Sequence, residues 1–419
     1  MTKTEYMEVL KESLSRFSQE LQDEILEDYN RHFSEGEKQG RSEEEIIREL
    51  GNIDEMIREL AEMDADIGQD ADIEQEAEEQ PGATDLEQSY SYVCGYRAVE
   101  LEGNVADVVL EPSDDGRIYV EYKNNMSVKY QRLYRFYQRE ENGVFYAGVK
   151  VKETQKKVRF LGRTVTVSGP LFSGRDNSIL LSVKIPAGLP GLVFHTTSGD
   201  VQVTGIKAGS LRGKTKSGDI EMNGTESEKI DLSALSGDLA LCDVKAREAK
   251  LTTTSGDINI KTLRAENLYA QTSSGDIELT GATELKEGEL TASSGDIDAE
   301  DIVAGTLSCT TTSGDIEAHA GGRLLRCSST SGDIEAIASG TAIQVDLTSV
   351  SGDVQLDMNQ IRGMDVNAIT VSGEIEITWQ GNRQNVGKGR HCYGDSGNKV
   401  NVSTVSGDIE IEGRGPEAG

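Results

Sequence analysis

The sequence predicts a mainly β protein, a single-stranded parallel β-solenoid with coils of about 19 residues, preceded by a small all-α domain. A Ser-Gly-Asp tripeptide recurs eleven times between Ser198 and Asp408, once as Ser-Gly-Glu, and its serines lie 19, 19, 19, 19, 20, 19, 18, 20, 21 and 34 residues apart. Such a short period is typical of coils stacked along one axis. The chain has 45 Gly but only 1 Trp and 7 Phe, which favours thin coils over a thick core. Parallel crossovers are right-handed, so we expect a right-handed coil.

Residues 1–63 are predicted to form short helices. Apolar residues recur at helical spacing in two sets, namely Tyr6, Val9, Leu10, Leu14 and Phe17, then Leu21, Ile25, Leu26, Tyr29 and Phe33. Ser42 and Glu45 form a capping box at the start of a third helix, and Gly51 is placed to end it. Short helices bury only a small core, so we expect this domain to bind a protein partner or to pair with a second copy of itself.

Residues 64–89 are predicted to be a flexible acidic linker. The stretch 62–88 contains eleven acidic residues and no basic one. Like charges repel one another and keep such a segment extended. The remaining boundaries that we predict are an irregular β region and N-terminal cap at 90–195, the repeats at 196–413, and a tail at 414–419. Within 196–413, residues 380–398 and the strand at 399–403 are predicted to form the C-terminal cap.

Residues 90–195 carry two hairpin signals and a basic stretch. A Ser-Asp-Asp-Gly turn follows the apolar run at 108–110, and Asn142-Gly143 separates two further strands. Residues 123–163 hold eleven Lys and Arg against three Glu, interleaved with aromatic residues that suit anionic ligands. The candidate anion-binding residues are Lys129, Arg132, Arg135, Lys150, Lys152, Lys156, Lys157 and Arg159. The alternative is an amphipathic hairpin whose charges balance the acidic linker.

The residues around the tripeptide predict the turn of each coil. Apolar residues alternate on both sides of it with a slip of one residue, which predicts a bulge or corner at Gly-Asp. In this interpretation the serine closes an inward column and the glycine supplies φ > 0. A further inward residue eight positions after the serine, as at Ile206, Val244, Leu263 and Ile302, gives three short sides per coil. The predicted structural turn glycines are Gly199, Gly218, Gly237, Gly256, Gly275, Gly295, Gly314, Gly332, Gly352, Gly373 and Gly407.

The aspartates of the tripeptides are predicted to form a ladder with steps of about 4.8 Å. One interpretation is a row of cation sites, with Asp257, Asp276, Asp296, Asp315 and Asp333 as candidate ligands. The other is that each aspartate caps an exposed turn, which we favour because the motif lacks the additional glycines and ligands of calcium-binding β-rolls. A second acidic column contains Glu221, Glu278, Asp298, Glu317, Glu335, Glu376 and Glu410.

Two outward columns are rich in hydroxyl groups, and one inward column holds two cysteines. Thr252 and Thr254, then Thr310 and Thr312, exemplify the hydroxyl columns. Such arrays bind ice or polysaccharide in some solenoids, although β-propensity alone also explains them. Cys309 and Cys327 occupy the same inward column in adjacent coils, and in a reducing compartment we expect two free core thiols.

Composition and the absence of motifs exclude several classes of protein. The formal net charge of −32 argues against nucleic acid as a partner of the whole chain. The 5 Cys have no CxxC spacing, and no reaction centre or cofactor motif is present. No signal peptide or apolar run long enough to span a membrane is found, so we expect a cytoplasmic protein. We therefore do not expect an enzyme. The sequence does not indicate an oligomeric state.

Two parts of the chain resemble known bacterial families. Residues 24–60, above all Gly-Arg-Ser-Glu-Glu-Glu-Ile-Ile-Arg-Glu-Leu-Gly at 40–51, resemble the HAAS-type helical domain of membrane and signalling proteins. Residues 96–112, the segment Ile179–Pro186, the repeated Ser-Gly-Asp-Ile-Glu and the final Thr-Val-Ser-Gly-Asp-Ile-Glu-Ile from Thr404 resemble the bacterial "putative adhesin" family of β-solenoid domains. The second resemblance covers residues 95–413, and it implies a β-solenoid in an adhesin-like protein.

These observations together predict a non-enzymatic, adhesin-like scaffold. The helical domain would bind a protein partner, and the solenoid would present a long acidic surface rich in Ser and Thr. One alternative is a β-helix protein that binds or cleaves polysaccharide, as pectate lyases and glycosidases do. A second alternative is binding of an anionic ligand through residues 123–163.

Overall fold

The computed structural model describes residues 3–14, 26, 33, 87–93, 95–126, 131, 133–151, 156–160, 163–167, 178–339, 343–395 and 397–415. The chain divides into two compact units. The first contains Met1–Gln88, Lys123–Phe136 and Lys150–Ile179, and the second contains Ser89–Tyr122, Tyr137–Val149 and Leu180–Gly419. The predicted capping box at Ser42 and most of the predicted linker lie outside the described residues. The expectation of a mainly β chain is confirmed.

The strands before the repeats include those that flank both predicted turns. They are β1 (Glu87–Val93), β2 (Ala98–Asn104), β3 (Asp107–Ser113), β4 (Arg117–Asn124), β5 (Tyr134–Glu141), β6 (Val144–Val151), β7 (Lys156–Phe160), β8 (Arg163–Val167), β9 (Ile179–Pro186) and β10 (Leu189–Thr196). Strand β9 pairs with both β3 and β4, so the Ser-Asp-Asp-Gly turn does not join a hairpin. Asn142 and Gly143, between β5 and β6, have φ of 52° and 73°, as a two-residue hairpin turn requires. β1 begins at Glu87, inside the segment predicted as linker.

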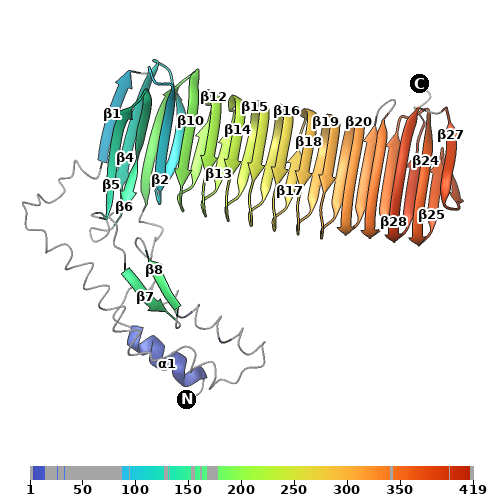
Figure 1. Ribbon diagram of the computed structural model, residues 1–419, viewed down its shortest axis with the longest axis horizontal. Coiled ribbons are helices and arrows are strands. Elements are labelled where there is room, and N and C mark those ends of the chain that lie inside the picture. Colours follow the sequence, from blue (N-terminus) through green and yellow to red (C-terminus); the bar gives the residue numbers. More distant parts are fainter. Residues whose placement is uncertain are drawn as a thin grey trace, which may run out of the picture. The chain divides into compact units, whose positions relative to one another are not determined.

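The repeats form the remaining strands, which Figure 1 shows stacked in one row. They are β11 (Val201–Thr204), β12 (Lys207–Lys214), β13 (Ile220–Asn223), β14 (Glu226–Ser233), β15 (Leu239–Thr252), β16 (Ile258–Gln271), β17 (Ile277–Thr280), β18 (Thr283–Thr291), β19 (Ile297–Thr310), β20 (Ile316–Ser331), β21 (Ile334–Ser339), β22 (Gln344–Ser351), β23 (Val354–Asn359), β24 (Gly363–Ser372), β25 (Ile375–Trp379), β26 (Asn382–Asn385), β27 (Gly389–Gly394), β28 (Asn398–Ser406) and β29 (Ile409–Gly413).

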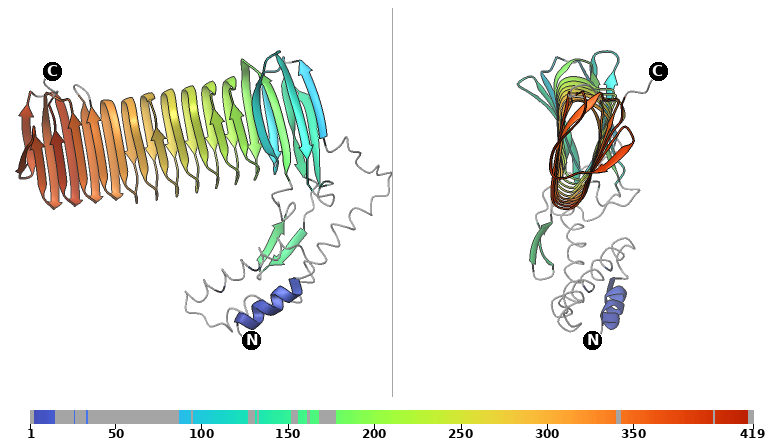
Figure 2. Two further views of the ribbon diagram at one scale, coloured as in Figure 1. Left: turned by 180° about the vertical axis from the view of Figure 1, so that it is seen from behind. Right: turned by 90° about the vertical axis from the view of Figure 1, so that its right-hand side faces the viewer.

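Successive coils pair in parallel and in register. Ile220 lies opposite Leu239, which lies opposite Ile258, and this column of buried aliphatic residues continues along the stack. The third inward position is also confirmed, since Ile206, Val244, Leu263 and Ile302 are buried. Most coils contain a short and a longer strand, such as β13 and β14, or one continuous strand, in place of three short sides. In the right-hand view of Figure 2, which looks along the stack, the coils form a narrow ring.

The corner of each coil begins earlier than predicted. Thr272 is buried, the following Ser273 and Ser274 face outward, and strict alternation resumes at the buried Gly275. The serine of every tripeptide is exposed, so the prediction that it closes an inward column is wrong. The slip in alternation therefore lies in the two residues before the glycine and not at Gly-Asp. These two residues carry the chain around the outside of the corner.

The motif glycine is required by a close contact and not by its backbone angle. None of the eleven has φ in the left-handed region, so the predicted role of φ > 0 is wrong. A Cβ on Gly275 would lie 2.0 Å from the carbonyl oxygen of Gly256, and one on Gly256 would lie 2.1 Å from that of Gly237. The same contact, at 1.9 to 2.2 Å, recurs at all eleven positions. Only glycine allows adjacent coils to approach so closely.

A buried hydroxyl group supplies hydrogen bonds to the backbone groups of the corner. Thr272 Oγ1 accepts the N–H of Gly275 at 3.1 Å and donates to the carbonyl of Gly256, one coil earlier, at 3.0 Å. Thr253 makes the same pair of bonds. A buried donor or acceptor without a partner costs about 1–3 kcal/mol, so this hydroxyl offsets that cost in the coils that contain it.

The left-handed backbone conformation occurs instead at a second corner, five residues after the motif aspartate. Gly205, Gly224 and Gly281 occupy this corner with φ of 66°, 60° and 74°. In other coils Asp243 and Thr262 hold the same conformation, with φ of 52° and 62°. A β-branched residue is strained there. This corner has no fixed residue type, which is why the sequence pattern did not reveal it.

Both ends of the stack depart from the order of the chain. Strand β28 pairs in parallel with β22 on one side and with β24 on the other, so the last coil in sequence lies between two earlier ones. The predicted C-terminal cap included residues 399–403, which instead lie inside the stack within β28. The end is covered by β27 and β26, which pair antiparallel with β24 and β25. Covering the last coil protects its unpaired edge.

The helical part of the chain is represented by α1 (Lys3–Leu14). Tyr6 and Leu10 are buried, and the Tyr6 ring meets the buried Phe33 edge-on at 6.0 Å. Val9, which we expected on the same inward face, is 44% exposed. Among the described helices, none is long and apolar enough to cross a membrane.

The glycine contact predicts a large loss of stability on substitution. Replacing Gly275 by alanine places a methyl group against the backbone carbonyl of Gly256, which cannot move away without separating two coils. We expect Gly275→Ala to lower the free energy of unfolding by about 3 kcal/mol or more. Urea unfolding followed by circular dichroism measures this. In the matched control Gly387→Ala, a Cβ would have nothing within 4 Å, and we expect a change within about 0.5 kcal/mol. Equal stabilities of the two variants would contradict the assignment.

Candidate functional site

The motif aspartates form a continuous hydrogen-bonded ladder along the stack. Asp276 Oδ1 accepts the backbone N–H of Asp296 at 2.8 Å, and Asp296 Oδ1 accepts that of Asp315 at 2.8 Å. The same bond joins every step, at 2.7 to 3.1 Å. Each carboxylate therefore bonds to the next coil and not to its own turn.

The ladder has a first step that the sequence pattern did not show. Asp107, at the start of β3, accepts the N–H of Asp200 at 3.1 Å, and burial raises the pKa of the Asp107 carboxyl. Ala106 precedes Asp107, where later coils have glycine. The only sequence signal is the apolar alternation that follows at 108–110. The coil formed by β2 and β3 thus belongs to the same ladder as the repeats.

Hydrogen bonding outweighs repulsion in this ladder. Two carboxylates about 4.8 Å apart repel by about 1 kcal/mol in water, and salt screens this further. A hydrogen bond to a charged acceptor contributes about 1.5–3 kcal/mol. Among the described residues, the candidates Asp257, Asp276, Asp296, Asp315 and Asp333 do not bring three ligand atoms together around one point. We therefore interpret the ladder as a structural device.

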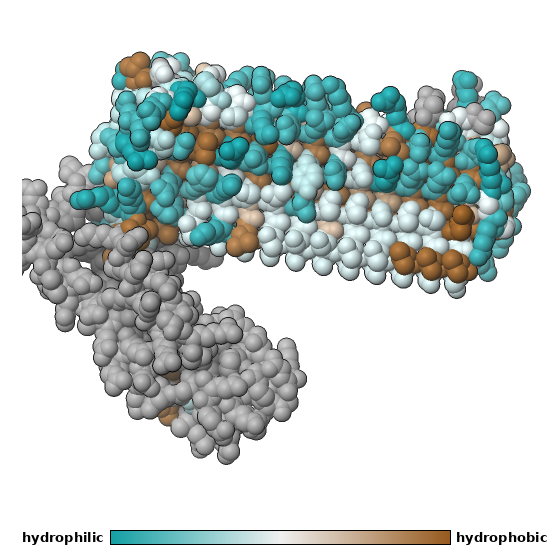
Figure 3. Space-filling model, in the orientation of Figure 1, coloured by the Kyte–Doolittle hydropathy of each residue, from teal (hydrophilic) through white to brown (hydrophobic). Residues whose placement is uncertain are grey.

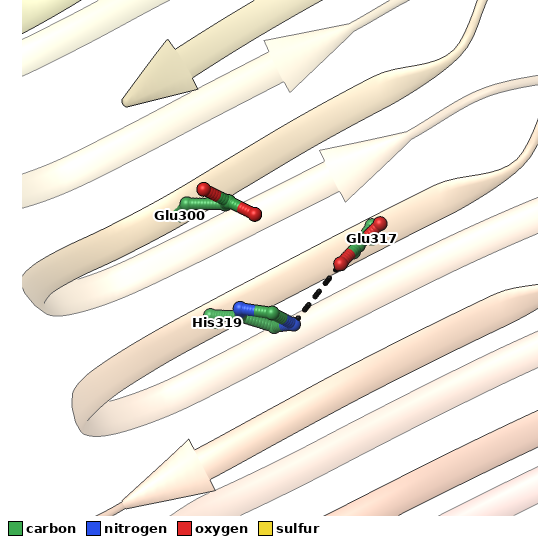
Figure 4. A group of neighbouring side chains, drawn as sticks. All are labelled: Glu300, Glu317 and His319. Atoms are coloured by element: carbon green, nitrogen blue, oxygen red, sulfur yellow. Dashed lines mark ion pairs between the residues drawn. The ribbon is translucent and has the colours of Figure 1, made fainter. Parts of the chain in front are cut away.

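A different cluster does bring three ligand atoms together. One ligand atom each from Glu300 of β19 and from Glu317 and His319 of β20 lies within 4.8 Å of the others. Figure 4 shows the three side chains on adjacent strands, with His319 Nε2 at 3.2 Å from Glu317 Oε1. Both glutamates are exposed, and this ion pair explains the arrangement. We assign no metal here.

A local irregularity produces this cluster. The pairing of β19 with β20 shifts between Ala299 and Ile302, so that Glu300 and Asp301 lie opposite the single residue His319. The signal in the sequence is the short spacing of 18 residues between Ser313 and Ser331, which removes one residue from this coil. Spacing alone did not show which side chains the shift would bring together.

Asp298, in the second acidic column, is the crowded member of this region. It lies opposite Glu278 on one side and Glu317 on the other. Burial raises the pKa of its carboxyl, and the charges of Glu300 and Glu317 raise it further. The folded state therefore holds an ionised Asp298 less favourably than the unfolded chain does.

The predicted basic patch is only partly described. Arg135 and Lys150 are exposed, whereas Lys129, Arg132 and Lys152 lie outside the described residues. Lys156, Lys157 and Arg159 fall in strand β7. The grouping of the eight residues into one patch stays a prediction. Nearby, Lys123 pairs with Glu87 at 3.3 Å, and Arg139 lies 4.5 Å from the centre of the Tyr146 ring.

The outward faces of the repeats are polar, with apolar positions toward one end. Thr252 is half-buried, and Thr254, Thr310 and Thr312 are exposed, as predicted. Figure 3 shows a mostly pale and teal face with isolated brown patches. In the last coils the position before the motif serine becomes valine, and the exposed members are Val350, Val405 and Val371. This polar face offers hydrogen-bonding groups at regular intervals.

The two core cysteines lie where the repeat predicts them. Cys309 and Cys327 are direct partners in the pairing of β19 with β20, and both are buried. Both are free thiols. A hydrogen bond with Cys309, together with burial, raises the pKa of the Cys327 thiol. A buried thiol with a raised pKa is a poor nucleophile.

Two families match the chain. Residues 96–320 and 261–412 match the family described as Toastrack DUF4097, and residues 5–59 match the family described as HAAS. No curated protein matches.

Several solved structures are similar to the chain. A "putative cell adhesion protein" from Clostridium sporogenes is 9% identical, covering 78% of this chain and 99% of its own, with a TM-score of 0.20. A "putative adhesin" from Parabacteroides merdae is 11% identical (78% and 95%, TM-score 0.34). A "putative lipid binding protein" from Parabacteroides distasonis is 14% identical (77% and 96%, TM-score 0.33). Likeness at these scores carries no argument about function.

The ladder predicts different effects for two substitutions of one aspartate. Asp276→Ala removes the acceptor for the Asp296 N–H, and we expect a loss of about 1–2 kcal/mol in the free energy of unfolding. Asp276→Asn keeps a carbonyl oxygen at the same place, so its loss should be below about 0.5 kcal/mol. Urea unfolding measures both. If calcium raised the melting temperature of the wild type but not of either variant, the ladder would be a cation site after all.

Asp298 predicts a pH-dependent gain of stability. Its pKa is raised in the folded state, so ionised Asp298 destabilises the fold at neutral pH. We expect Asp298→Asn to stabilise the protein at pH 7 by up to about 1 kcal/mol. The gain should shrink as the pH falls through the folded pKa, and vanish below the unfolded value of about 3.9, where both states are protonated. Urea unfolding across this pH range measures it. Asp231→Asn, which loses an ion pair with Arg212, serves as control and should show no gain.

Proposed function

The chain belongs to the Toastrack DUF4097 family, and from this premise we propose that it is a non-enzymatic, adhesin-like interaction scaffold. In this proposal the helical domain binds a protein partner, and the repeats form a right-handed β-solenoid that presents an extended acidic surface rich in Ser and Thr. The segments predicted at 1–63, 64–89, 90–195 and 196–413 serve as partner-binding domain, tether, cap and rod. A cytoplasmic location stays a prediction.

One observation supports the proposal above all. The groups of the repeated motif are engaged with the neighbouring coil: the glycine through its close contact, the aspartate through the ladder and, in coils that have it, the buried hydroxyl through the glycine backbone. A motif whose groups contact the next coil serves to hold the stack of coils together. The residues that differ between coils face outward and are left to interact with other molecules.

The arrangement of the titratable groups also favours a scaffold over an enzyme. Catalysis by side chains needs an acid, a base or a nucleophile within reach of one another. The described histidines are spread along the stack, with His195 in β10, His319 in β20 and His391 in β27. The ladder carboxylates form a uniform row, which carries no sign of one reactive centre.

A polysaccharide-binding or polysaccharide-cleaving β-helix is the first alternative. The exposed hydroxyl columns favour it, because Thr254 and Thr312 exemplify a row of donors and acceptors repeated once per coil. Release of new reducing ends from a polysaccharide would distinguish cleavage from binding.

Binding of an anionic ligand through the basic stretch at 123–163 is the second alternative. The exposed Arg135 and Lys150 support it. The ion pair of Lys123 with Glu87 supports the competing view that these charges are balanced within the chain. Each lysine paired in this way is one fewer available to a ligand.

Val9 provides a test of partner binding in the full chain. It is a large hydrophobic residue exposed on α1, beside the buried Leu10. We place a photoreactive amino acid at position 9 and expect a cross-link to one specific protein in cells. We expect Val9→Glu to reduce co-purification of that protein roughly tenfold or more, because a carboxylate would have to lose its water in the contact.

The control is Lys11→Ala, an exposed position on the same helix. It should leave co-purification unchanged, and circular dichroism should show both variants folded. Equal recovery of the partner with Val9→Glu and with the wild type would refute docking on this face of the helix.

A further inference from the structure

A groove opens where the repeats begin. At this place β2 pairs with β10, β10 with β12, and β12 with β14, and Figure 1 shows these strands in order. Two outward columns and the buried threonine column between them form the groove. The residues that matter for its chemistry are Glu102, His195, Thr196, Lys214, Lys216 and Ser233.

Thr196 differs from the equivalent threonines of later coils. It is 7% exposed, and its Oγ1 is buried and has no hydrogen-bond partner. Thr253 and Thr272 donate the same hydroxyl to a motif glycine one coil earlier. In the coil before Thr196 the motif glycine is replaced by Ala106. Asn104, with φ of 54°, lies opposite Thr196, and the pairing shifts between His195 and Thr196. The groove thus retains a buried hydroxyl that the fold itself leaves unsatisfied.

The carbonyl of Asn104, which lies opposite Thr196, is occupied by backbone groups of the corner. Asn104 O accepts the N–H groups of Thr197 at 2.7 Å, Ser198 at 3.0 Å and Gly199 at 3.4 Å. A buried polar group without a partner is costly, so such a group indicates a bound ligand or water. Thr196 lines the groove, so a molecule bound there would supply the missing partner.

The charges of the groove oppose those of the rest of the chain. The chain carries a formal net charge of −32, whereas Lys214 and Lys216 are exposed side by side in the groove. Within the described residues neither ammonium group has an ion-pair partner. Glu102, the acidic residue of the groove, accepts the Tyr137 hydroxyl at 2.6 Å. Burial and the Lys214 cation lower the pKa of His195, so at neutral pH its imidazole offers a donor without a charge.

We propose that this groove binds the carboxylate of an acidic polysaccharide. Lys214 and Lys216 bind the carboxylate, Thr196 Oγ1 donates to it or to a sugar hydroxyl, and Ser233 begins the hydroxyl column along which the sugar chain continues. Ser233 lies opposite Thr252, and Thr252 lies opposite Gln271, so polar groups follow the groove coil by coil. This site deepens the polysaccharide-binding alternative above and is independent of partner binding at α1.

The test is calorimetric titration of the full chain with tetragalacturonate. We expect binding that weakens as salt is added, because the lysines are exposed and their attraction is screened. Lys214→Gln and Lys216→Gln should each weaken it roughly tenfold, the loss of one charge-assisted hydrogen bond. Lys245→Gln, an exposed lysine on a later coil, should leave the affinity unchanged. Uncharged maltotetraose should not bind.

Thr196→Val distinguishes an effect on ligand binding from an effect on the stability of the fold. We expect this variant to lose affinity severalfold while its melting temperature is unchanged or raised, because the hydroxyl it removes has no partner in the fold. Thr272→Val, which removes a fully bonded hydroxyl, should lower the melting temperature and leave the affinity unchanged. A melting temperature lowered equally in both variants, with no effect on affinity, would overturn the role of Thr196.

Other results would overturn the site itself. No binding of tetragalacturonate would do so, and so would binding that is equal in the wild type and both lysine variants, which would place it in the basic stretch at 123–163. If inorganic tetraphosphate bound and tetragalacturonate did not, the groove would be a phosphate site and the carboxylate assignment would be wrong. Loss of the partner captured at Val9 would leave this proposal untouched.

Discussion

The stack of coils depends on one close contact between backbones. At each corner the motif glycine lies against a backbone carbonyl of the neighbouring coil, in most cases that of its motif glycine, where a Cβ would come within 1.9 to 2.2 Å. This distance sets how closely the coils approach, and the other bonds of the corner depend on it. The aspartate ladder and the buried hydroxyl both join one coil to the next over about 3 Å, which requires the coils to be this close.

The same contact explains why the repeated residues have few polar groups free to bind other molecules. The ladder carboxylates lie on the surface, yet each is committed to a backbone N–H of its neighbour. Their mutual repulsion, screened by water and salt, is smaller than the gain from these bonds. In the sequence an acidic row of this kind resembles a series of metal sites. In the structure its carboxylates hydrogen-bond one coil to the next. Specific chemistry arises where the repeat is interrupted.

Three interruptions stand out. The 18-residue coil brings Glu300 next to His319, and the irregular pairing at Asn104 leaves the Thr196 hydroxyl unbonded. The 34-residue gap lets the last coil insert before its predecessor. Each follows from a coil that lacks the standard spacing or residue. In a repeat protein, irregular coils are therefore the first places to look for binding. Among the described residues, the groove at Lys214 and Lys216 combines charge, shape and an unsatisfied buried group.

The sequence by itself determined the period, the inward columns and the pairing of neighbours. It placed Ile206 and Leu263 inside, put Cys309 opposite Cys327 and identified the Asn142-Gly143 hairpin. These features follow from alternation within a strand and from local turn chemistry, both of which a linear pattern records. The tertiary structure alone decided that the motif serine faces outward, that the glycine serves contact and not φ, and that β28 lies between β22 and β24. Those features depend on which coil lies beside which and how closely, and contacts across coils leave no mark on the spacing of residues within one coil.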